Sequence, residues 1–170
     1  MAEYLIQDTT LYEIAEAIRS RTKKTDEILV SDMAKEIRDI VIQRESVVNP
    51  STTSIPAYTY YQMTSIPKYI TFEKVKTVGA HAFTLTRVKK LKFLVVTSID
   101  TYGLNSEDLE CLILSGSTVP TLGSNALVAT QIAKGLGYIY VTDSLIDSYK
   151  SDAAWSTYAN QIKPISEYTE

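Results

Sequence analysis

The sequence predicts an α+β protein, with a short helical segment first, a small solenoid of stacked parallel strands next, and a helical cap last. Three observations predict this class. Apolar residues recur at helical spacing within residues 10–44, a seven-residue pattern returns at steps of 21–23 residues from residue 54 onward, and short alternating apolar segments separate its copies. A near-constant step of this size is typical of stacked repeats. We therefore expect two regions, 1–46 and 47–170.

Two amphipathic helices are expected in the first region, over residues 10–20 and 32–44. Thr10 and Glu13 have the spacing of a capping box, and Ser31 is placed to cap the second helix. Each helix is short and apolar on one side, so it needs a surface to pack on. That surface is either another copy of the chain, the edge of the repeats or a different protein. The residues expected at this interface are Leu11, Ile14, Ile18, Met33, Ile37 and Ile40.

The repeat is clearest in the heptapeptide TVGAHAF at residues 77–83. It matches SIDTYGL at 98–104 and TLGSNAL at 121–127, and a weaker copy, SIPAYTY, covers 54–60. The shared pattern is a small polar residue, an aliphatic residue, three mostly polar positions, a small residue and a large apolar one. Stacked repeats place equivalent residues above one another. The aliphatic column is expected to contain Ile55, Val78, Ile99 and Leu122.

Short strands are expected between the copies, because apolar residues there alternate with period two. The residues expected to point inward are Ile70, Phe72, Leu91, Phe93, Leu112, Leu114, Ile139 and Val141. The outward column between them is expected to contain Thr71, Lys92, Ile113 and Tyr140. After the last strand, Asp143 is expected to be an N-cap, and Trp155, Tyr158 and Ile162 have helical spacing. We expect this tail to close the open end of the repeats as a helical cap.

Two parts of the sequence resemble known families. The repeated pattern over residues 47–165 resembles the leucine-rich repeats of the bacterial surface antigen (BspA-like) type. The stretch LYEIAEAIRSRTKKTDEILVSDMAKEIRDI resembles a helical segment near the start of structural proteins of phages and prophages of Gram-positive hosts, although the glycine usual after its first lysine pair is absent. Together these resemblances imply a phage virion protein, a tail, baseplate or head fibre component, which self-associates through residues 1–46, with a trimer favoured.

Charge and composition argue against several other classes. The formal net charge is −3, which gives no general reason to expect a nucleic-acid partner. The N-terminal sequence lacks the basic and apolar regions of a secretory signal, and no apolar run is long enough to span a bilayer. The one cysteine, Cys111, excludes a disulfide within one chain. We expect a chain made in the host cytoplasm, without membrane insertion, and located in the virion.

Catalysis is not expected from the titratable residues. The only histidine, His81, occupies a variable slot of the repeat that elsewhere holds tyrosine or asparagine, which favours a surface contact role. A thiol nucleophile at Cys111 would need a nearby base. The acidic group around Asp108 and Glu110 is expected on a solvated rim. No enzyme activity, cofactor or metal is therefore expected.

Charged residues of successive repeats are expected to pair with one another. The basic cluster contains Arg87, Lys89, Lys90 and Lys92. The next repeat supplies acidic residues, namely Asp100, Glu107, Asp108 and Glu110. Ion pairs between neighbouring repeats, or with a partner, are therefore favoured over a nucleic-acid site.

The 12 tyrosines are the most informative feature for function. Tyrosine offers a rigid ring with a polar tip, which suits contact with proteins or sugars, although filler at half-exposed positions is equally expected. The surface expected to bind a partner contains Tyr58, Tyr60, Tyr61, His81, Tyr102, Tyr138 and Tyr140. The expected function is that of a non-enzymatic virion protein, which contacts other virion proteins and a host-surface protein or glycan. The alternatives are a bacterial surface adhesin and a soluble phage-encoded inhibitor of a host protein.

Overall fold

The structure is a computed structural model that describes residues 46–47 and 52–169, with only the backbone described at 46–47. The chain divides into two units, Met1–Arg44 and Glu45–Glu170, and the described residues all belong to the second. The helices expected at 10–20 and 32–44 lie outside the described residues, together with all six side chains of the expected oligomer interface.

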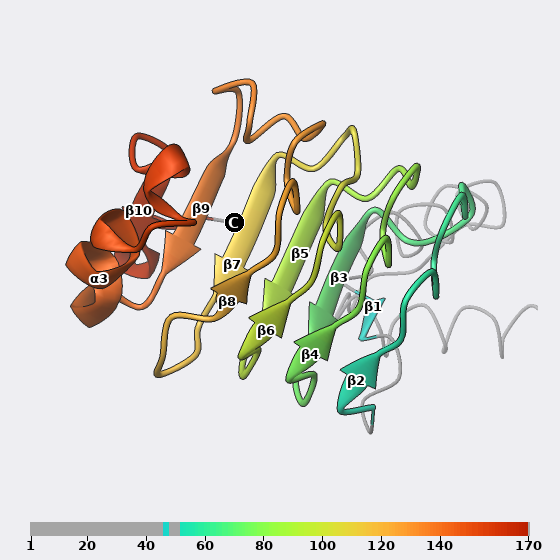
Figure 1. Cartoon of the computed structure of the whole chain (residues 1–170), viewed down its shortest axis with the longest axis horizontal. Helices are drawn as coiled ribbons and strands as arrows, with labels where there is room; N and C mark the ends of the chain where they lie inside the picture. Colours follow the sequence, from blue (N-terminus) through green and yellow to red (C-terminus); the bar gives the residue numbers. More distant parts are fainter. Residues whose placement is uncertain (1–45, 48–51, 170) are drawn as a thin grey trace, which may run out of the picture. The chain divides into compact units, whose positions relative to one another are not determined.

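Two parallel β-sheets form the framework of the described unit (Figure 1). Strands of the two sheets alternate along the chain, so that one repeat contributes one strand to each sheet. The six-stranded sheet has the order β1-β3-β5-β7-β9-β10, with strands at Ser46–Val47, Tyr69–Phe72, Lys90–Phe93, Cys111–Leu114, Tyr138–Val141 and Ile162–Pro164. The four-stranded sheet has the order β2-β4-β6-β8, with strands at Ser54–Ile55, Thr77–Val78, Ser98–Ile99 and Thr121–Leu122.

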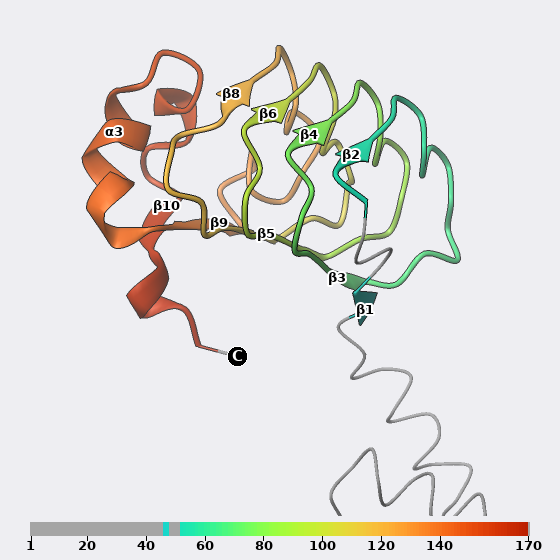
Figure 2. The ribbon, with the colours of Figure 1, turned by 90° about the horizontal axis from the view of Figure 1, so that it is seen from below.

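The sheets lie on opposite sides of one hydrophobic core (Figure 2). In the four-stranded sheet Val78 pairs with Ile99, and Ile99 pairs with Leu122, which confirms the expected column. In the six-stranded sheet the rings of Phe72 and Phe93 stack with their centroids 5.1 Å apart. The inward positions predicted for this sheet are confirmed, since none is more than 1% exposed: Ile70, Phe72, Leu91, Phe93, Leu112, Leu114, Ile139 and Val141.

The outer face of the six-stranded sheet is less exposed than the sequence suggests. Ile113 alternates with core residues along β7, so its side chain points away from the core, yet only 1% of it is exposed. Its neighbours across the sheet are Lys92 and Tyr140. Thr71, in the same column, is also buried, at 8% exposure. Long side chains on adjacent strands can cover shorter ones in this way.

The segment that follows each strand of the four-stranded sheet also bonds to the next repeat. The amide of Tyr58 donates to the carbonyl of Ala80 at 3.0 Å, and the amide of His81 donates to that of Thr101 at 3.1 Å. These turn segments therefore form a hydrogen-bonded side of their own, although they are not strands. We call this side the turn face, and it contains residues 56–62, 79–85, 100–105 and 123–128.

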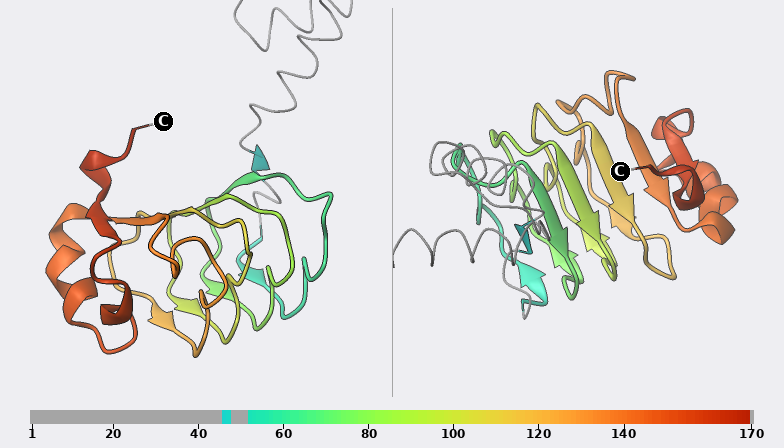
Figure 3. Two further views of the ribbon diagram at one scale, coloured as in Figure 1. Left: turned by 90° about the horizontal axis from the view of Figure 1, so that it is seen from above. Right: turned by 180° about the vertical axis from the view of Figure 1, so that it is seen from behind.

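The C-terminal segments lie at the end of the sheets next to β9 (Figure 3). Trp155 is fully buried there, and its indole Nε1–H donates to the carbonyl of Pro120 at 2.7 Å. Strand β10 pairs in parallel with β9 and becomes the last strand of the larger sheet. The helical elements of this end are η1 at Asp143–Leu145, α3 at Ile146–Ser151, η2 at Ser156–Tyr158 and η3 at Ile165–Glu167.

The fold class predicted from the sequence is wrong. The described residues form two sheets of parallel strands with one short α-helix, an α/β-like fold, rather than a helical segment followed by a leucine-rich-repeat solenoid. The helical cap is also not as predicted. Trp155 lies in a turn, Tyr158 ends a 3₁₀ segment, and Ile162 begins strand β10. The physical reason is that β9 presents an edge of backbone groups, which a strand satisfies and a helix cannot.

Candidate functional site

Three aromatic side chains from successive repeats form a stack on the turn face. The rings of Tyr58 and His81 are nearly parallel, at 7°, with centroids 5.1 Å apart. The rings of His81 and Tyr102 lie at 17°, with centroids 4.8 Å apart. We call Tyr58, His81 and Tyr102 the aromatic column. The step of one repeat thus sets the stacking distance of the rings, because each ring comes from the same position of its repeat.

The backbone at this position is left-handed in every copy. The φ angles are 60° at Tyr58, 55° at His81, 54° at Tyr102 and 57° at Asn125. Asparagine tolerates this conformation, whereas for bulky side chains it is uncommon and carries a local cost. The surrounding hydrogen bonds offset this conformational cost. One of them joins the Tyr102 amide to the Ser124 carbonyl at 3.2 Å. The rings are therefore fixed on a rigid backbone.

The column is extended at both ends by polar or aromatic contacts. Tyr61 meets Tyr58 edge to face, with centroids 5.5 Å apart, and these two residues are 38% and 56% exposed. At the other end the side-chain amide of Asn125 donates to the hydroxyl of Tyr102 at 3.1 Å. Thr84 Oγ1 lies 3.4 Å from Nδ1 of His81. Because the stacked rings cover the faces that they turn toward one another, the aromatic column presents ring edges and polar atoms to the outside.

Tyr60 is not part of this surface, although the sequence groups it with Tyr58 and Tyr61. It turns inward and stacks on Phe83, with centroids 5.0 Å apart, in the column of large apolar residues. Burial raises the pKa of its hydroxyl above the ordinary value. Tyr60 therefore ends a core column at the first repeat, which explains why a tyrosine replaces the Phe or Leu of the other copies.

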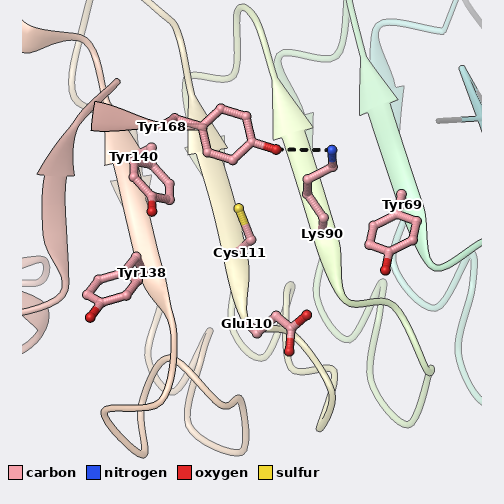
Figure 4. A pocket seen from close by; sticks show the side chains of 7 residues that line it. All are labelled: Tyr69, Lys90, Glu110, Cys111, Tyr138, Tyr140 and Tyr168. Atoms are coloured by element: carbon pink, nitrogen blue, oxygen red, sulfur yellow. Dashed lines mark hydrogen bonds between the residues drawn. The ribbon is translucent and has the colours of Figure 1, made fainter. Parts of the chain in front are cut away.

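A second group of tyrosines lies on the outer face of the six-stranded sheet (Figure 4). It surrounds a shallow hollow of about 360 Å³. The first residue of each of four neighbouring strands contributes to it, because these positions share one register and one face. The residues that line the hollow are Tyr69, Lys90, Glu110, Cys111, Tyr138, Tyr140 and Tyr168.

Tyr168 reaches this hollow from the segment that follows β10. Its ring meets Tyr140 on β9 at a centroid distance of 5.0 Å, and its hydroxyl accepts a hydrogen bond of 3.2 Å from Lys90 Nζ on β5. Because β7 lies between β9 and β5, the Tyr168 side chain crosses over β7. The pKa of Tyr140 is raised, first by burial and then by the neighbouring Cys111 and other acidic groups. The C-terminal segment is thus fastened across the sheet.

Apart from Tyr60, the predicted partner-binding residues therefore fall into two separate groups. Tyr58, Tyr61, His81 and Tyr102 lie together on the turn face, as the sequence grouped them. Tyr138 and Tyr140 belong to the hollow on the six-stranded sheet. Five residues of that hollow are absent from the partner-binding surface predicted from the sequence, namely Tyr69, Lys90, Glu110, Cys111 and Tyr168. The strand register indicates three of them, because Tyr69, Lys90 and Cys111 occupy the same position as Tyr138; nothing in the sequence indicates Tyr168.

The residues weighed for catalysis lie apart or in ion pairs. His81 belongs to the turn face, whereas Cys111 belongs to the outer face of the six-stranded sheet. Arg87 Nε lies 3.0 Å from the carboxylate of Asp108, and Lys89 Nζ lies 3.9 Å from that of Glu110. The prediction that neighbouring repeats pair their charges is confirmed for these two pairs.

Within residues 46–47 and 52–169, no group of three or more His, Cys, Asp or Glu side chains could hold a metal ion. No helix in that part of the chain is both long enough and apolar enough to cross a membrane. No protein-family model matches the chain, and no curated protein or solved structure matches it significantly.

Proposed function

We propose that this chain is a non-enzymatic structural protein of a phage virion and that its repeats contact the host surface. Residues 1–46 would attach it to other virion proteins and associate with further copies of the chain, a trimer being favoured. The virion assignment is supported by the sequence resemblance of that N-terminal segment. The contact role is supported by the aromatic column, which is the observation that carries the proposal.

The aromatic column has the properties of a recognition surface. Tyr58 and Tyr61 are exposed residues, and Tyr102 presents a hydroxyl already oriented by Asn125. Tyrosine rings bury much area at a low entropic cost, and their hydroxyls supply directional hydrogen bonds. The rings are stacked on a bonded backbone, so little ordering is needed on binding. A host-surface protein or glycan is the ligand class that this surface suits.

The experiment has two stages, the first of which locates the protein. Virions are purified from a culture of the producing host, and their proteins are identified by mass spectrometry. We expect peptides of this chain at a constant ratio to the major capsid protein. Absence of the chain from virions, together with its presence in the cytoplasm of infected cells, would overturn the virion assignment and favour the inhibitor. Its presence on uninfected cells would favour the adhesin.

The second stage measures adsorption of virions to host cells. Replacement of Tyr58 and Tyr102 by Ala should slow adsorption at least tenfold while the chain remains in the virion. Tyr138→Ala is the matched control, because it removes an exposed tyrosine from the other group. Equal adsorption of the double variant and the native virion would exclude the aromatic column as the contact surface.

A further inference from the structure

The two sheets end differently at the C-terminal side of the molecule. The six-stranded sheet continues beyond its last repeat, because β10 pairs with β9 along three residues. Among the residues that the structure describes, the four-stranded sheet has no such continuation, and β8 is its last strand. One sheet is therefore closed by the chain itself, whereas the other ends in an edge strand. Such edges present unpaired backbone groups that can receive another strand.

The free side of β8 can be located from its hydrogen bonds to the preceding repeat. The amides of Thr121 and Gly123 donate to the carbonyls of Thr97 and Ile99, at 3.0 and 2.7 Å. Backbone groups alternate in direction along a strand, so the N–H and C=O of Leu122 point away from β6. In the earlier repeats the equivalent groups hold the next strand of the sheet.

The turn face ends in the same way, three residues beyond Leu122. The amide of Tyr102 donates to the Ser124 carbonyl, but the amide of Asn125, its counterpart in the last repeat, makes no hydrogen bond within the described residues. The amide of Leu127 makes none there either, although Leu127 is fully buried. Buried amides without a partner are rare in folded proteins, because each loses its bond to water.

A groove of about 410 Å³ runs beside these groups. One wall is the last repeat, from Leu122 to Val128, and the other is the C-terminal segment. The second wall carries three small side chains, Ala153, Ala154 and Thr157, together with the half-buried Tyr158. That wall is held in shape by Asp152, whose carboxylate accepts hydrogen bonds from the amides of the second and third residues after it. The groove is therefore bounded by open backbone groups on one side and a fixed turn on the other.

We infer that this groove binds an extended peptide segment of a partner protein, which adds to β8 as a parallel fifth strand of the four-stranded sheet. Addition of a strand to an open edge is a common mode of peptide recognition, in which main-chain bonds supply affinity and side-chain pockets supply specificity. The incoming backbone would accept from and donate to Leu122 and then accept from Asn125. The groove adjoins the aromatic column at Asn125, which also bonds the Tyr102 hydroxyl, but the inference does not depend on the virion assignment.

The repeat itself defines the side chains that the peptide should carry. Each strand of the four-stranded sheet begins with Ser or Thr, and the hydroxyl of Thr77 donates to that of Ser54 at 2.8 Å. The second residue is aliphatic and packs in the core column, whose last member, Leu122, is only half-buried. A partner segment should therefore present a hydroxyl residue, then an aliphatic residue over Leu122, then small residues along the alanines of the groove.

A second copy of this chain does not fit the site equally well. The strand that a second copy could offer first is β2, in which Ile55 is followed by Pro56. In the other repeats this following residue donates its amide to the preceding strand, as Gly79 does to the Ile55 carbonyl at 2.8 Å. Proline has no amide hydrogen, so the carbonyl of Leu122 would stay unsatisfied.

The test uses a synthetic peptide with the sequence of residues 76–84, KTVGAHAFT, added to the full-length ¹⁵N-labelled chain. We expect shifted amide signals confined to 121–128 and 152–158, and at least tenfold slower hydrogen exchange at Leu122 and Asn125. The matched control peptide, KTDGAHAFT, carries aspartate in place of the aliphatic residue and should cause no change. Absence of binding by KTVGAHAFT, or signal changes elsewhere on the chain, would overturn the inference.

Two variants of the protein block the groove independently. Ala154→Trp fills it, and Thr157→Trp obstructs it from an exposed position that tolerates a large side chain. Each should weaken binding of KTVGAHAFT at least tenfold, whereas Leu136→Ala, on a residue outside the groove, should leave it unchanged. If Ala154→Trp does not fold, Thr157→Trp decides alone. Undiminished binding by a folded blocking variant would overturn the inference.

Discussion

The six-stranded and four-stranded sheets are built from the same repeats, yet they serve the molecule differently. Strands β3, β5, β7 and β9 have four residues each, with two core side chains per strand, whereas strands of the smaller sheet have two residues with one. The larger sheet is also closed by β10 and crossed by Tyr168, and the smaller one ends openly at β8. The comparison teaches that packing is concentrated in one sheet, while the smaller sheet and its turn face retain surfaces for contact.

The largest expected effect comes from removing a leucine from the larger sheet. Leu112 is fully buried between neighbouring strands, so Leu112→Ala should lower the free energy of unfolding by about 2–5 kcal/mol. Leu122→Ala makes the same chemical change at the open edge, where the side chain is already half-exposed. Its cost should be less than half as large, because less apolar surface is lost from the core. Chemical denaturation of the two variants measures both values.

Equal losses of unfolding free energy in Leu112→Ala and Leu122→Ala would contradict the difference between the two sheets, because the edge strand β8 would then be packed as tightly as the central strand β7. A smaller loss at Leu112 than at Leu122 would reverse it. The midpoint and slope of the denaturation curve must both be compared, because a changed slope reports a change in the denatured state rather than in packing.

The arrangement of the strands was predictable because one pattern occurs four times at a nearly constant step. The step from Val78 to Ile99 sets their pairing, and alternation places Leu91 and Phe93 in the core. The fold class was not predictable in the same way, because the two-residue segment containing Val78 is too short to be recognised as a strand. Only hydrogen bonding to its neighbours on both sides makes it part of a second sheet.

The candidate site was predictable only where the repeat determines it. Tyr58, His81 and Tyr102 share one slot of the pattern, so their grouping follows from sequence, although their left-handed backbone does not. Tyr168 lies outside the repeat, and its contact with Lys90 spans 78 positions of the chain. Contacts of this kind depend on the path of the C-terminal segment, which helical spacing predicted wrongly.

The next largest effect concerns two glycines that approach the backbone of the preceding repeat. A Cβ at Gly137 would meet the carbonyl of Glu110, and a Cβ at Gly123 would meet the amide of Thr101. Gly137 leads into β9, which is held between β7 and β10, whereas Gly123 follows β8, which is free on one side. Gly137→Ala should cost about 1–3 kcal/mol, and Gly123→Ala should cost less because its strand can shift.

Gly116→Ala is the control for both glycine variants. The nearest atoms to a Cβ at this position are 3.8 Å away, so an ordinary contact forms and stability should change little. Thermal unfolding of the three variants under one condition gives their order. A larger loss of thermal stability in Gly123→Ala than in Gly137→Ala would show that the four-stranded sheet is the more rigid of the two sheets.

A smaller effect is expected from the ion pair between Arg87 and Asp108. These residues precede β5 and β7, and their side chains are 58% and 28% exposed. Exposed pairs of this kind contribute about 0.2–1 kcal/mol and lose strength in salt. Asp108→Asn should therefore destabilise the protein slightly at low ionic strength and not at 1 M salt. A double-mutant cycle with Arg87→Gln isolates the pair from other effects, and a coupling energy of zero at low salt would contradict its contribution to the larger sheet.

The smallest effect is a pH dependence at the segment that closes the larger sheet. The Asp143 carboxylate accepts a hydrogen bond of 3.2 Å from the Ser166 amide, and hydrogen bonds from Ser166 lower the pKa of Asp143 below its ordinary value of 3.8. A pKa that is lower in the folded state than in the unfolded state means that the ionised carboxylate stabilises the fold. This stabilisation is fully present at a pH above the pKa of the unfolded state, and it is lost as the pH falls through the pKa of the folded state. The Ser166 amide signal should therefore change with pH only below the ordinary range of aspartate. Asp143→Asn should abolish that titration, whereas Asp147→Asn, at an exposed aspartate of α3, should leave it intact. If Ser166 titrates identically in Asp143→Asn, the C-terminal segment is held by its other contacts, and closure of the larger sheet rests on β10 and Tyr168 alone.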